Sequence, residues 1–222
     1  MIQWKVVYYV SPSGKNPVSK FIDSCIKPQQ VKILRIFRHL EEYGPQTAIS
    51  HIKKLSGTPF WEIRILGKDN IRIIYAVEAK KTVILLHGFF KKRRKTPKKE
   101  IEICYKRYEK FKGSWQDDIL FDIISLMRNK LYTLQDDLKK RLKDPEFRRL
   151  WQESEVEYQL ARKLMEKRLS KKISQRELAI KVKTTQAVIS RIESMAANPS
   201  LGLLKRLAGA LNTRLEIRFL PK

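Results

Sequence analysis

Five basic side chains in strand-like segments are the residues of this sequence whose types and spacing could do chemistry: Arg64, Arg72, His87, Lys91 and Lys92. Arginine can clamp a phosphate with two parallel N–H donors, whereas lysine and histidine can carry protons. Around each of them apolar residues recur at every second position, which predicts strands with the cations on the opposite face. On neighbouring strands of one small sheet these side chains would line a single concave surface. We expect that surface to grip phosphates.

The elements that must position these side chains follow from the same alternation. Strands are predicted at residues 2–10, 52–55, 60–66, 70–77 and 82–90. Helices are predicted to start at Asn16-Pro17, at Pro28 (with its end at Gly44-Pro45) and at Thr96-Pro97. Gly67-Lys68-Asp69 predicts a hairpin turn between two strands. The order βααββββα predicts an α+β fold, a small antiparallel sheet with packed helices.

Composition points to a polyanionic partner. The 222 residues carry 48 Lys and Arg against 23 Asp and Glu, a net charge of +25, and residues 1–112 hold 25 of the basic and 9 of the acidic ones. Nucleic acid or an anionic membrane surface would suit this charge. No apolar run is long enough to span a membrane and the N-terminus does not resemble a signal peptide, so we expect a cytoplasmic protein.

Metal and cofactor chemistry is not expected from the cysteines and histidines. Cys25 and Cys104 lack the spacing of a metal site and fit a reducing compartment. The three histidines form no HExxH motif and no cluster with cysteine, so we predict no metal and no cofactor. His39 and His51 have no supporting pattern and are interpreted as ordinary surface or helix histidines.

The segments WEIR, IRIIY and LLHGFFKKRRKTPKKEIE carry a resemblance to a known family. Residues 2–112 resemble the RelE/ParE toxin superfamily, closest to its phage-derived HigB-like branch. The resemblance implies a ribosome-dependent mRNA endonuclease that works without metal. ParE members share the fold but poison DNA gyrase, so a gyrase poison is an alternative.

The resemblance also implies roles for the basic residues. Metal-free RNA cleavage uses the 2′-hydroxyl as nucleophile and needs a base, an acid and positive charge for the transition state. Arg64 and Arg72 would be phosphate clamps, and Lys91 and Lys92 would transfer protons or stabilise charge, because like charges lower a lysine's pKa. His87 is the candidate acid. RNA contacts are assigned to Lys53, Lys54, Phe89, Arg93 and Arg94, although a core role is the more expected one for Phe89 or Phe90.

The second half reads as a separate domain that begins at Met127, with residues 113–126 as a linker or connecting helix. Asp144-Pro145-Glu146 predicts a helix start. An apolar stripe follows at helical spacing, and it predicts either core or a docking face for the basic half: Phe147, Leu150, Trp151, Tyr158, Ala161 and Met165. The nearby Glu153, Glu155 and Glu157 fit docking or an ordinary solvated face equally well.

Residues 174–193, SQRELAIKVKTTQAVISRIE, contain the clearest motif. Ser174 and Glu177 form a capping box, Thr185 caps a second helix, and a third helix is predicted after Pro199. Residues 160–220 resemble the Xre/Cro-type helix-turn-helix, in which Lys183 stands where the family usually has a turn glycine and would be left-handed. DNA contacts are assigned to Gln175, Thr185, Gln186, Ser190 and Arg191. Alternation at 215–219 predicts a short terminal strand, at a dimer edge.

The order of the two halves matches a HigB-like toxin followed by a HigA-like antitoxin. By analogy this implies a type II toxin–antitoxin fusion in which the second half neutralises the first, in cis or in trans, and binds operator DNA as a homodimer. The partners would be mRNA on the ribosome and operator DNA. The alternative from another class is a transcription regulator whose RelE-like half is catalytically inactive.

Overall fold

The computed structural model describes residues 4–45, 52–65, 70–79, 81–91, 96–113 and 131–218. The chain divides into two compact units, Met1–Glu153 and Ser154–Lys222. The predicted turn at residues 67–69 and the predicted linker at 114–126 lie outside the described residues.

The first unit contains one sheet and five described helices. The strands are β1 (Lys5–Tyr8), β2 (Ile52–Lys54), β3 (Phe60–Ile65), β4 (Ile71–Glu78) and β5 (Thr82–Phe90). The helices are α1 (Pro17–Asp23), α2 (Lys27–Tyr43), α3 (Lys98–Gly113), α5 (Leu134–Arg141) and α6 (Pro145–Glu153). Up to α3 this is the predicted order βααββββα. Asn16 caps α1 through its Oδ1, which accepts from the Ser19 amide at 2.9 Å, as the Asn-Pro pair indicated.

The sheet has the strand order β1-β5-β4-β3-β2. Neighbouring strands from β2 to β5 are antiparallel, but β1 pairs with β5 in parallel, with Val6 opposite Val83. The prediction of a purely antiparallel sheet was therefore wrong at this edge. The two helices between β1 and β2 carry the chain away from the β1 edge, and the β2–β5 meander then ends beside β1 in the same direction.

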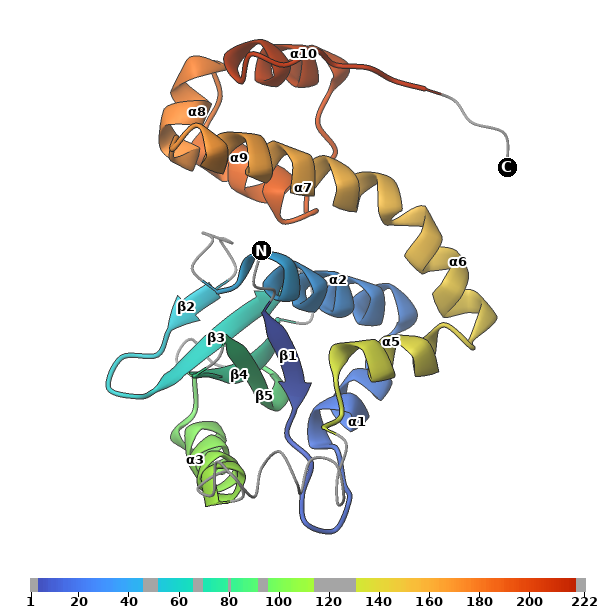
Figure 1. The fold of residues 1–222 in the computed structure, drawn as a ribbon, viewed down its shortest axis with the longest axis vertical. Coiled ribbons are helices and arrows are strands. Elements are labelled where there is room, and N and C mark those ends of the chain that lie inside the picture. Colours follow the sequence, from blue (N-terminus) through green and yellow to red (C-terminus); the bar gives the residue numbers. More distant parts are fainter. Residues whose placement is uncertain are drawn as a thin grey trace. The chain divides into compact units, whose positions relative to one another are not determined.

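Each face of the sheet has its own apolar core. On one face α1 and α2 pack over residues such as Val6, Ile63 and Ile73, and on the other α3 packs over Ile74 and Leu86 (Figure 1). Gly88 of β5 permits the α1 packing, because a Cβ there would lie 2.1 Å from the Phe21 ring. The alternation of β3, β4 and β5 therefore sends one set of side chains toward α1 and α2 and the other toward α3.

Helices α5 and α6 belong to the first unit. Its boundary at Glu153 therefore lies later in the chain than the predicted domain start at Met127. Leu134, Phe147 and Trp151 are buried in the same core as α2. The backbone N–H of Tyr8 donates to the Tyr132 carbonyl at 2.9 Å, so the chain before α5 runs along β1. Apolar residues of the stripe at Phe147 and Trp151 thus form a docking face, as one of the two interpretations predicted.

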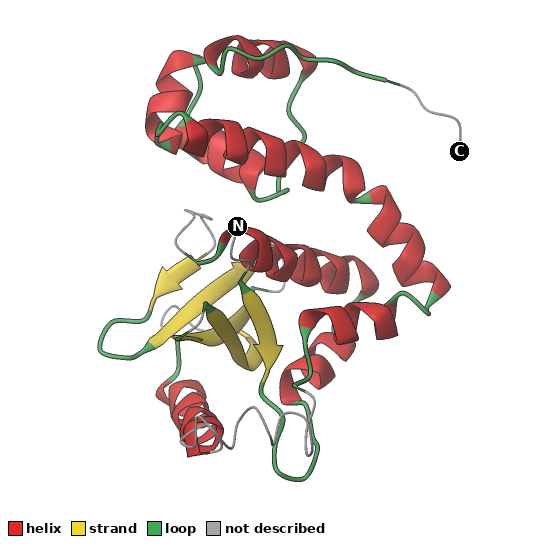
Figure 2. Ribbon diagram, viewed as in Figure 1, coloured by secondary structure: helices red, strands yellow, loops and turns green. Residues whose placement is uncertain are grey.

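The described part of the second unit consists of helices joined by loops (Figure 2). They are α7 (Glu155–Ser170), α8 (Gln175–Lys181), α9 (Gln186–Glu193) and α10 (Leu201–Ala210). Their core contains Leu164, Leu178, Ile189 and Leu207. Residues 213–218 form no strand within a single chain, because none of the described residues supplies a hydrogen-bonding neighbour. The terminal strand at residues 215–219 was predicted at a dimer edge and stays a prediction.

Candidate functional site

A buried carboxylate organises the basic side chains on the α3 side of the sheet. Glu62 of β3 is fully buried, and its Oε1 accepts from Arg64 Nε at 2.8 Å and lies 3.5 Å from Arg72 Nε. Its Oε2 accepts from the Thr96 hydroxyl at 2.6 Å. Together with Lys91 these residues are called the Glu62 cluster. Burial alone would raise the pKa of Glu62, but the hydrogen bonds from Thr96 and Arg64 and the charge of Lys91 outweigh it and lower that pKa.

The two arginines differ in how far they can reach a ligand. Arg64 and Arg72 are directly opposite each other on β3 and β4, so the structure brings them together as predicted. The Arg64 side chain is 33% exposed and that of Arg72 only 9%. Arg72 Nη1 donates to the carbonyl of Ile71 at 2.9 Å. Arg64 is therefore the more accessible of the two arginines, while Arg72 lies deeper.

Lys91 completes the cluster at the end of β5. Its backbone N–H donates to the Asn70 carbonyl at 3.1 Å, and its Nζ lies 3.5 Å from Thr96 Oγ1. Burial, followed by the charges of Arg72, Arg64 and Lys53, lowers the pKa of Lys91, although Glu62 opposes the shift. This is the direction expected for a lysine crowded by cations. Three cations around one carboxylate leave a surplus of positive charge.

His87 is held by both of its ring nitrogens. Arg107 of α3 places Nη1 2.9 Å from His87 Nδ1, and Glu100 places Oε2 2.6 Å from His87 Nε2. Because arginine can only donate, Nδ1 accepts, and the ring is the neutral tautomer with its proton on Nε2. Burial and the charge of Arg107 lower the pKa of His87, although Glu100 opposes the shift. The predicted role as an acid does not fit this arrangement, because Arg107 and Glu100 already engage both ring nitrogens.

Four residues of this site were not singled out from the sequence: Glu62, Thr96, Glu100 and Arg107. Glu62 was identifiable, since it alternates with Trp61 and Ile63 on the same face as Arg64. Glu100 and Arg107 are seven residues apart, two turns of α3, and so lie on the helix face that carries the buried Cys104. Only the apolar residues of that face were identified from the sequence, so Glu100 and Arg107 were not recognised.

The residues assigned to RNA contacts have divided positions. Lys53 and Lys54 of β2 are exposed, and Lys53 is opposite Glu62 in the register. Phe89 is 9% exposed and belongs to the α3-side core, where its ring stacks on His87 at 5.7 Å, so it is mainly a packing residue. Phe90 is 40% exposed and packs on Phe21. Lys92, Arg93 and Arg94 lie outside the described residues.

A second charged cluster holds α5 against β1 and α1 on the opposite side of the sheet. Asp137, fully buried, accepts from the hydroxyls of Tyr8 (3.0 Å), Ser19 (2.8 Å) and Tyr132 (2.9 Å) and from Arg141 Nε (2.9 Å). These five residues are called the Asp137 cluster. Burial and the charge of Asp137 raise the pKa of Tyr8 well above its usual value. Each oxygen of this carboxylate therefore accepts from at least two donors.

Two further contacts hold α6 and its cap. The Arg35 guanidinium lies 3.8 Å from the centroid of a Trp151 ring and donates through Nη2 to the Trp151 carbonyl at 2.6 Å. Lys27 Nζ donates to Asp144 Oδ2 at 2.5 Å, while Asp144 Oδ1 caps α6 by accepting from the Phe147 amide at 2.9 Å. The predicted helix start at Asp144 is confirmed. Asp144 also forms an ion pair with Lys27 of α2.

The helix-turn-helix in the second unit has the local structure that its sequence predicts. Ser174 Oγ accepts from the Glu177 amide at 3.1 Å and Glu177 Oε2 accepts from the Ser174 amide at 2.7 Å, which completes the capping box of α8. Lys183 has φ +52°, the left-handed conformation expected in place of a glycine. Thr185 Oγ1 caps α9 by accepting from the Val188 amide at 3.3 Å.

A buried ion pair links α7 to the end of α9. Arg168 donates from Nε and Nη2 to both oxygens of Glu193, at 2.6 and 2.9 Å. Gln175, only 6% exposed, donates its Nε2 to the same carboxylate at 2.7 Å. The phosphate contact assigned to the Gln175 side chain does not fit this arrangement, because its amide is turned inward. Of the other assigned DNA contacts, Gln186 and Arg191 of α9 and the cap residue Thr185 are exposed, and Ser190 is half-buried.

Within the described ranges, no group of three or more His, Cys, Asp or Glu side chains gathers as a metal site would, so no residue is assigned to a metal. In the same residues no helix is both long enough and apolar enough to cross a membrane.

Two family models match the chain. Residues 20–109 match the family described as Phage derived protein Gp49-like (DUF891), and residues 164–217 match the Helix-turn-helix family. No curated protein matches the chain. The chain therefore carries a Gp49-like domain followed by a DNA-binding helix-turn-helix domain. This agrees with the coarse division drawn from the sequence.

Proposed function

We propose that this chain is a toxin–antitoxin fusion, in which the first half cleaves mRNA on the ribosome and the second half neutralises it and binds operator DNA. The order of a Gp49-like domain and a helix-turn-helix domain supports the pairing. The charge of the first half, with 25 basic against 9 acidic residues in 1–112, supports a nucleic acid as its substrate.

The observation that carries the proposal is the Glu62 cluster. RNA cleavage by the 2′-hydroxyl forms a bond from the 2′-oxygen to phosphorus and breaks the bond to the 5′-oxygen, so the products are a cyclic phosphate and a 5′-hydroxyl. Lys91, whose lowered pKa makes a neutral amine more accessible, would take the proton from the 2′-hydroxyl. Arg64 would stabilise the extra charge on the phosphate oxygens. Lys92 remains the candidate for protonating the 5′-oxygen.

Glu62 would act by holding these groups, not by touching the substrate. Its hydrogen bonds to Arg64 and Thr96 fix both side chains, and Thr96 in turn lies beside Lys91. Such preorganisation spares the transition state the free energy of reorienting the cations. A carboxylate on the substrate side would repel phosphate, but Glu62 is completely buried beneath the cations.

Neutralisation in cis would not depend on covering this cluster with α5 and α6. Those helices pack on α2 and β1, on the face of the sheet opposite the Glu62 cluster and α3. We propose instead that they tether the second unit, whose bulk would keep the toxin out of the ribosomal site.

A second function is favoured by one observation. Both ring nitrogens of His87 are engaged by Glu100 and Arg107, and Glu62 partly compensates the two arginines. A first half that binds RNA or a partner without cleaving it would have the same arrangement. The chain would then be a transcription regulator with a non-catalytic interaction domain.

Expression of the first unit alone, residues 1–153, and of the full chain distinguishes the two functions. We expect growth arrest and loss of message, with cuts mapped by primer extension, only when residues 154–222 are absent. The full chain should be harmless. Arg64→Ala in residues 1–153 is the inactive reference, and Lys20→Ala, an exposed lysine of α1, is the matched control.

Message that stays intact while folded residues 1–153 are present would leave the regulator function. Growth arrest with intact message and a DNA-damage response would instead point to gyrase. Arrest by the full chain at equal protein levels would contradict neutralisation in cis.

A further inference from the structure

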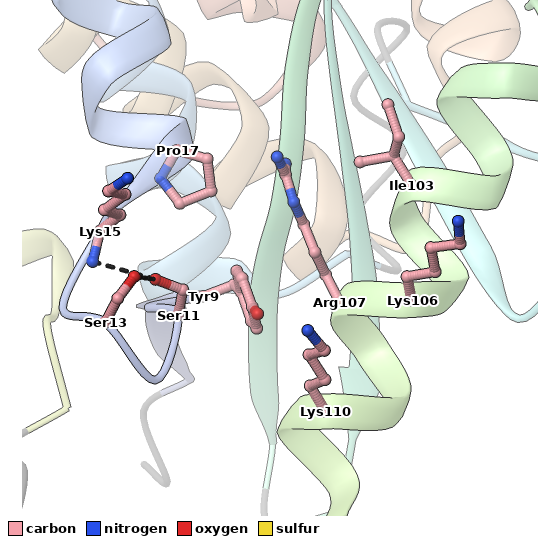
Figure 3. A pocket seen from close by; sticks show the side chains of 9 residues that line it. All are labelled: Tyr9, Ser11, Ser13, Lys15, Pro17, Ile103, Lys106, Arg107 and Lys110. Atoms are coloured by element: carbon pink, nitrogen blue, oxygen red, sulfur yellow. Dashed lines mark hydrogen bonds between the residues drawn. The ribbon is translucent and has the colours of Figure 1, made fainter.

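A second basic site lies on the α3 side of the first unit, apart from the Glu62 cluster. It is a cavity of about 390 Å³ between the loop after β1 and the exposed face of α3 (Figure 3). Its lining contains four cations: Lys15 from the loop, and Lys106, Arg107 and Lys110 from α3. The other lining residues are Tyr9, Ser11, Ser13, Pro17 and Ile103, so none of the nine is acidic. We call this cavity the Lys15 pocket.

The loop wall of the pocket is held by its own hydrogen bonds. Ser11 N–H donates to the Lys15 carbonyl at 2.9 Å, and Lys15 N–H donates to Ser11 Oγ at 3.1 Å. The hydroxyls of Ser11 and Ser13 lie 2.9 Å apart, and Gly14 supplies the left-handed residue of the turn with φ +76°. The basic and hydroxyl groups of this wall are therefore presented by a closed turn.

The opposite wall concentrates like charges on one helix. Lys106 and Lys110 are four residues apart on α3 and Arg107 lies between them, so the three cations share one side of the helix. Like charges at this spacing repel each other and cost some helix stability. An anion bound beside these cations would offset their repulsion, so the cluster would then stabilise the helix.

Arg107 connects the pocket to the candidate site. Its Nη1 donates to the Leu86 carbonyl at 2.8 Å and to His87 Nδ1 at 2.9 Å, while the rest of its side chain lines the pocket. Thr96 of the Glu62 cluster lies two residues before α3 begins at Lys98, and Lys106 and Lys110 lie about 12 and 18 Å along that helix. The pocket and the cluster would thus meet different nucleotides of one strand.

The pocket fits a phosphate better than a base. Tyr9 is the aromatic residue of its lining, but it is 5% exposed and packed in the α3-side core, so its ring has no free face for stacking. Lysine amines and serine hydroxyls are donors that suit phosphate oxygens. The pocket therefore provides charge and hydrogen-bond donors without a stacking platform.

We propose that the Lys15 pocket binds a backbone phosphate of the RNA strand at a nucleotide some distance from the bond held at the Glu62 cluster. This inference rests on the proposed function in that RNA is the ligand, but it does not require cleavage. It assigns to the loop after β1 and to α3 a role in holding the strand in register with the Glu62 cluster.

The test measures binding of the full chain to a short fluorescent single-stranded RNA with 2′-O-methyl groups, which cannot be cleaved. The variant Lys15→Ala/Lys110→Ala removes one cation from each wall. We expect affinity to fall on the order of tenfold, as for the removal of hydrogen bonds to a charged group. The slope of log affinity against log salt, between about 50 and 200 mM, should become shallower by about 0.7 for each phosphate that the variant no longer neutralises.

The matched control is Lys20→Ala/Lys139→Ala, which removes the same charge from exposed positions on α1 and α5. It should change the salt slope by less than half as much. Thermal unfolding confirms that both double variants fold, and Lys15→Glu/Lys110→Glu should enlarge the loss of affinity if the pocket binds the strand. Equal binding by the pocket and control variants overturns the proposal.

Titration with inorganic phosphate separates the two sources of this chemistry. A rise in the unfolding temperature of the wild-type chain with inorganic phosphate, while the pocket and control variants bind RNA equally, is one outcome. That result would mean a small-anion site and not an RNA subsite. Failure of the cleavage function has a different signature. RNA would then stay uncut by residues 1–153, whereas the pocket variants would still bind the uncleavable strand more weakly than the control.

Discussion

The Glu62 cluster and the Asp137 cluster are built from similar groups and have opposite characters. In each, a fully buried carboxylate accepts from arginine and from hydroxyls. Around Asp137, three hydroxyls and one arginine satisfy the carboxylate, and the Arg141 guanidinium also donates to Gln30 Oε1 at 3.0 Å and lies 2.9 Å from Asp23. Around Glu62, three cations share one carboxylate, and Arg64 is one-third exposed.

The difference teaches how to tell a structural ion network from a binding site in this fold. A network whose donors and acceptors are matched gains nothing from a ligand, and its removal costs stability. A network with surplus charge at its exposed edge carries repulsion that an anion relieves. The Arg168–Glu193–Gln175 group of the second unit belongs with the first kind, since its members are buried and bonded to each other.

The largest expected effect is on stability, from Asp137→Ala. This change leaves the buried Arg141 without its main partner, so the first unit should lose about 3–5 kcal/mol of unfolding free energy. Denaturant unfolding followed by tryptophan fluorescence reports on this unit, because all four tryptophans lie in residues 1–153. Arg149→Ala, which breaks an exposed ion pair with Glu153, is the control and should cost at most about 1 kcal/mol. Similar losses for both would show that the Asp137 cluster is not structural.

The next effect is on activity, from Arg64→Ala in the Glu62 cluster. Loss of one pre-aimed donor typically removes about 3 kcal/mol of transition-state stabilisation, so message cleavage by residues 1–153 should fall about a hundredfold. Stability should fall less than in Asp137→Ala, because Thr96, Arg72 and Lys91 still surround the buried Glu62 carboxylate. Cleavage rates on translating ribosomes and thermal unfolding measure the two quantities. Unchanged cleavage would remove Arg64 from the site, and a stability loss like that of Asp137→Ala would place it with the structural kind.

The pH dependence of the unfolding free energy extends the comparison to a buried histidine whose pKa is shifted by burial alone. His39 of α2 is 3% exposed, its Nε2 has no hydrogen-bond partner among the described residues, and burial lowers its pKa to about 4. A depressed histidine pKa means that stability is complete above about pH 6.5 and is lost as the pH falls toward 4, by up to about 3 kcal/mol. His39→Leu should flatten this part of the profile of unfolding free energy. Parallel profiles for wild type and variant would contradict it.

The smallest expected effect concerns the exposed face of α9, outside the Arg168–Glu193 pair. Gln186→Ala should cost about 1–3 kcal/mol of operator affinity and relax preference at one base pair. Binding to a set of operator variants measures this, with Gln159→Ala on α7 as the control. If Gln186→Ala weakened all sequences equally, Gln186 would contact the DNA backbone.

Local sequence patterns predicted the elements well where one residue or a short spacing decides them. The caps at Asn16, Asp144, Ser174 and Thr185 form as predicted, because a capping side chain bonds to a backbone amide only three residues away. Lys183 adopts the left-handed conformation for the same local reason. Alternation placed Arg64 and Arg72 correctly on one face of the sheet, since the period of a strand is independent of its neighbours.

Partners distant in the sequence decided the rest. The parallel pairing of β1 with β5 joins Val6 to Val83, and no local pattern specifies which edge a strand will take. His87 was assigned as an acid because its type allows it, but Arg107 and Glu100 on α3 determine its tautomer. Gln175 was assigned to a phosphate from its place at a helix start, yet Glu193 turns it inward.

By itself, the sequence determined the α+β first half, the helix-turn-helix of the second, and the gathering of basic residues on one face of a sheet, because periodicity, caps and composition are properties of short segments. Only the tertiary structure decided that α5 and α6 belong to the first unit, that Glu62 holds the cations, and that Asp137 is saturated. Those outcomes depend on which buried groups find partners distant in the sequence: Glu62 and Thr96 are 34 residues apart, and Tyr8 and Asp137 are 129 residues apart. The free energy of burying a charge depends on those partners, and they are fixed only when the chain folds.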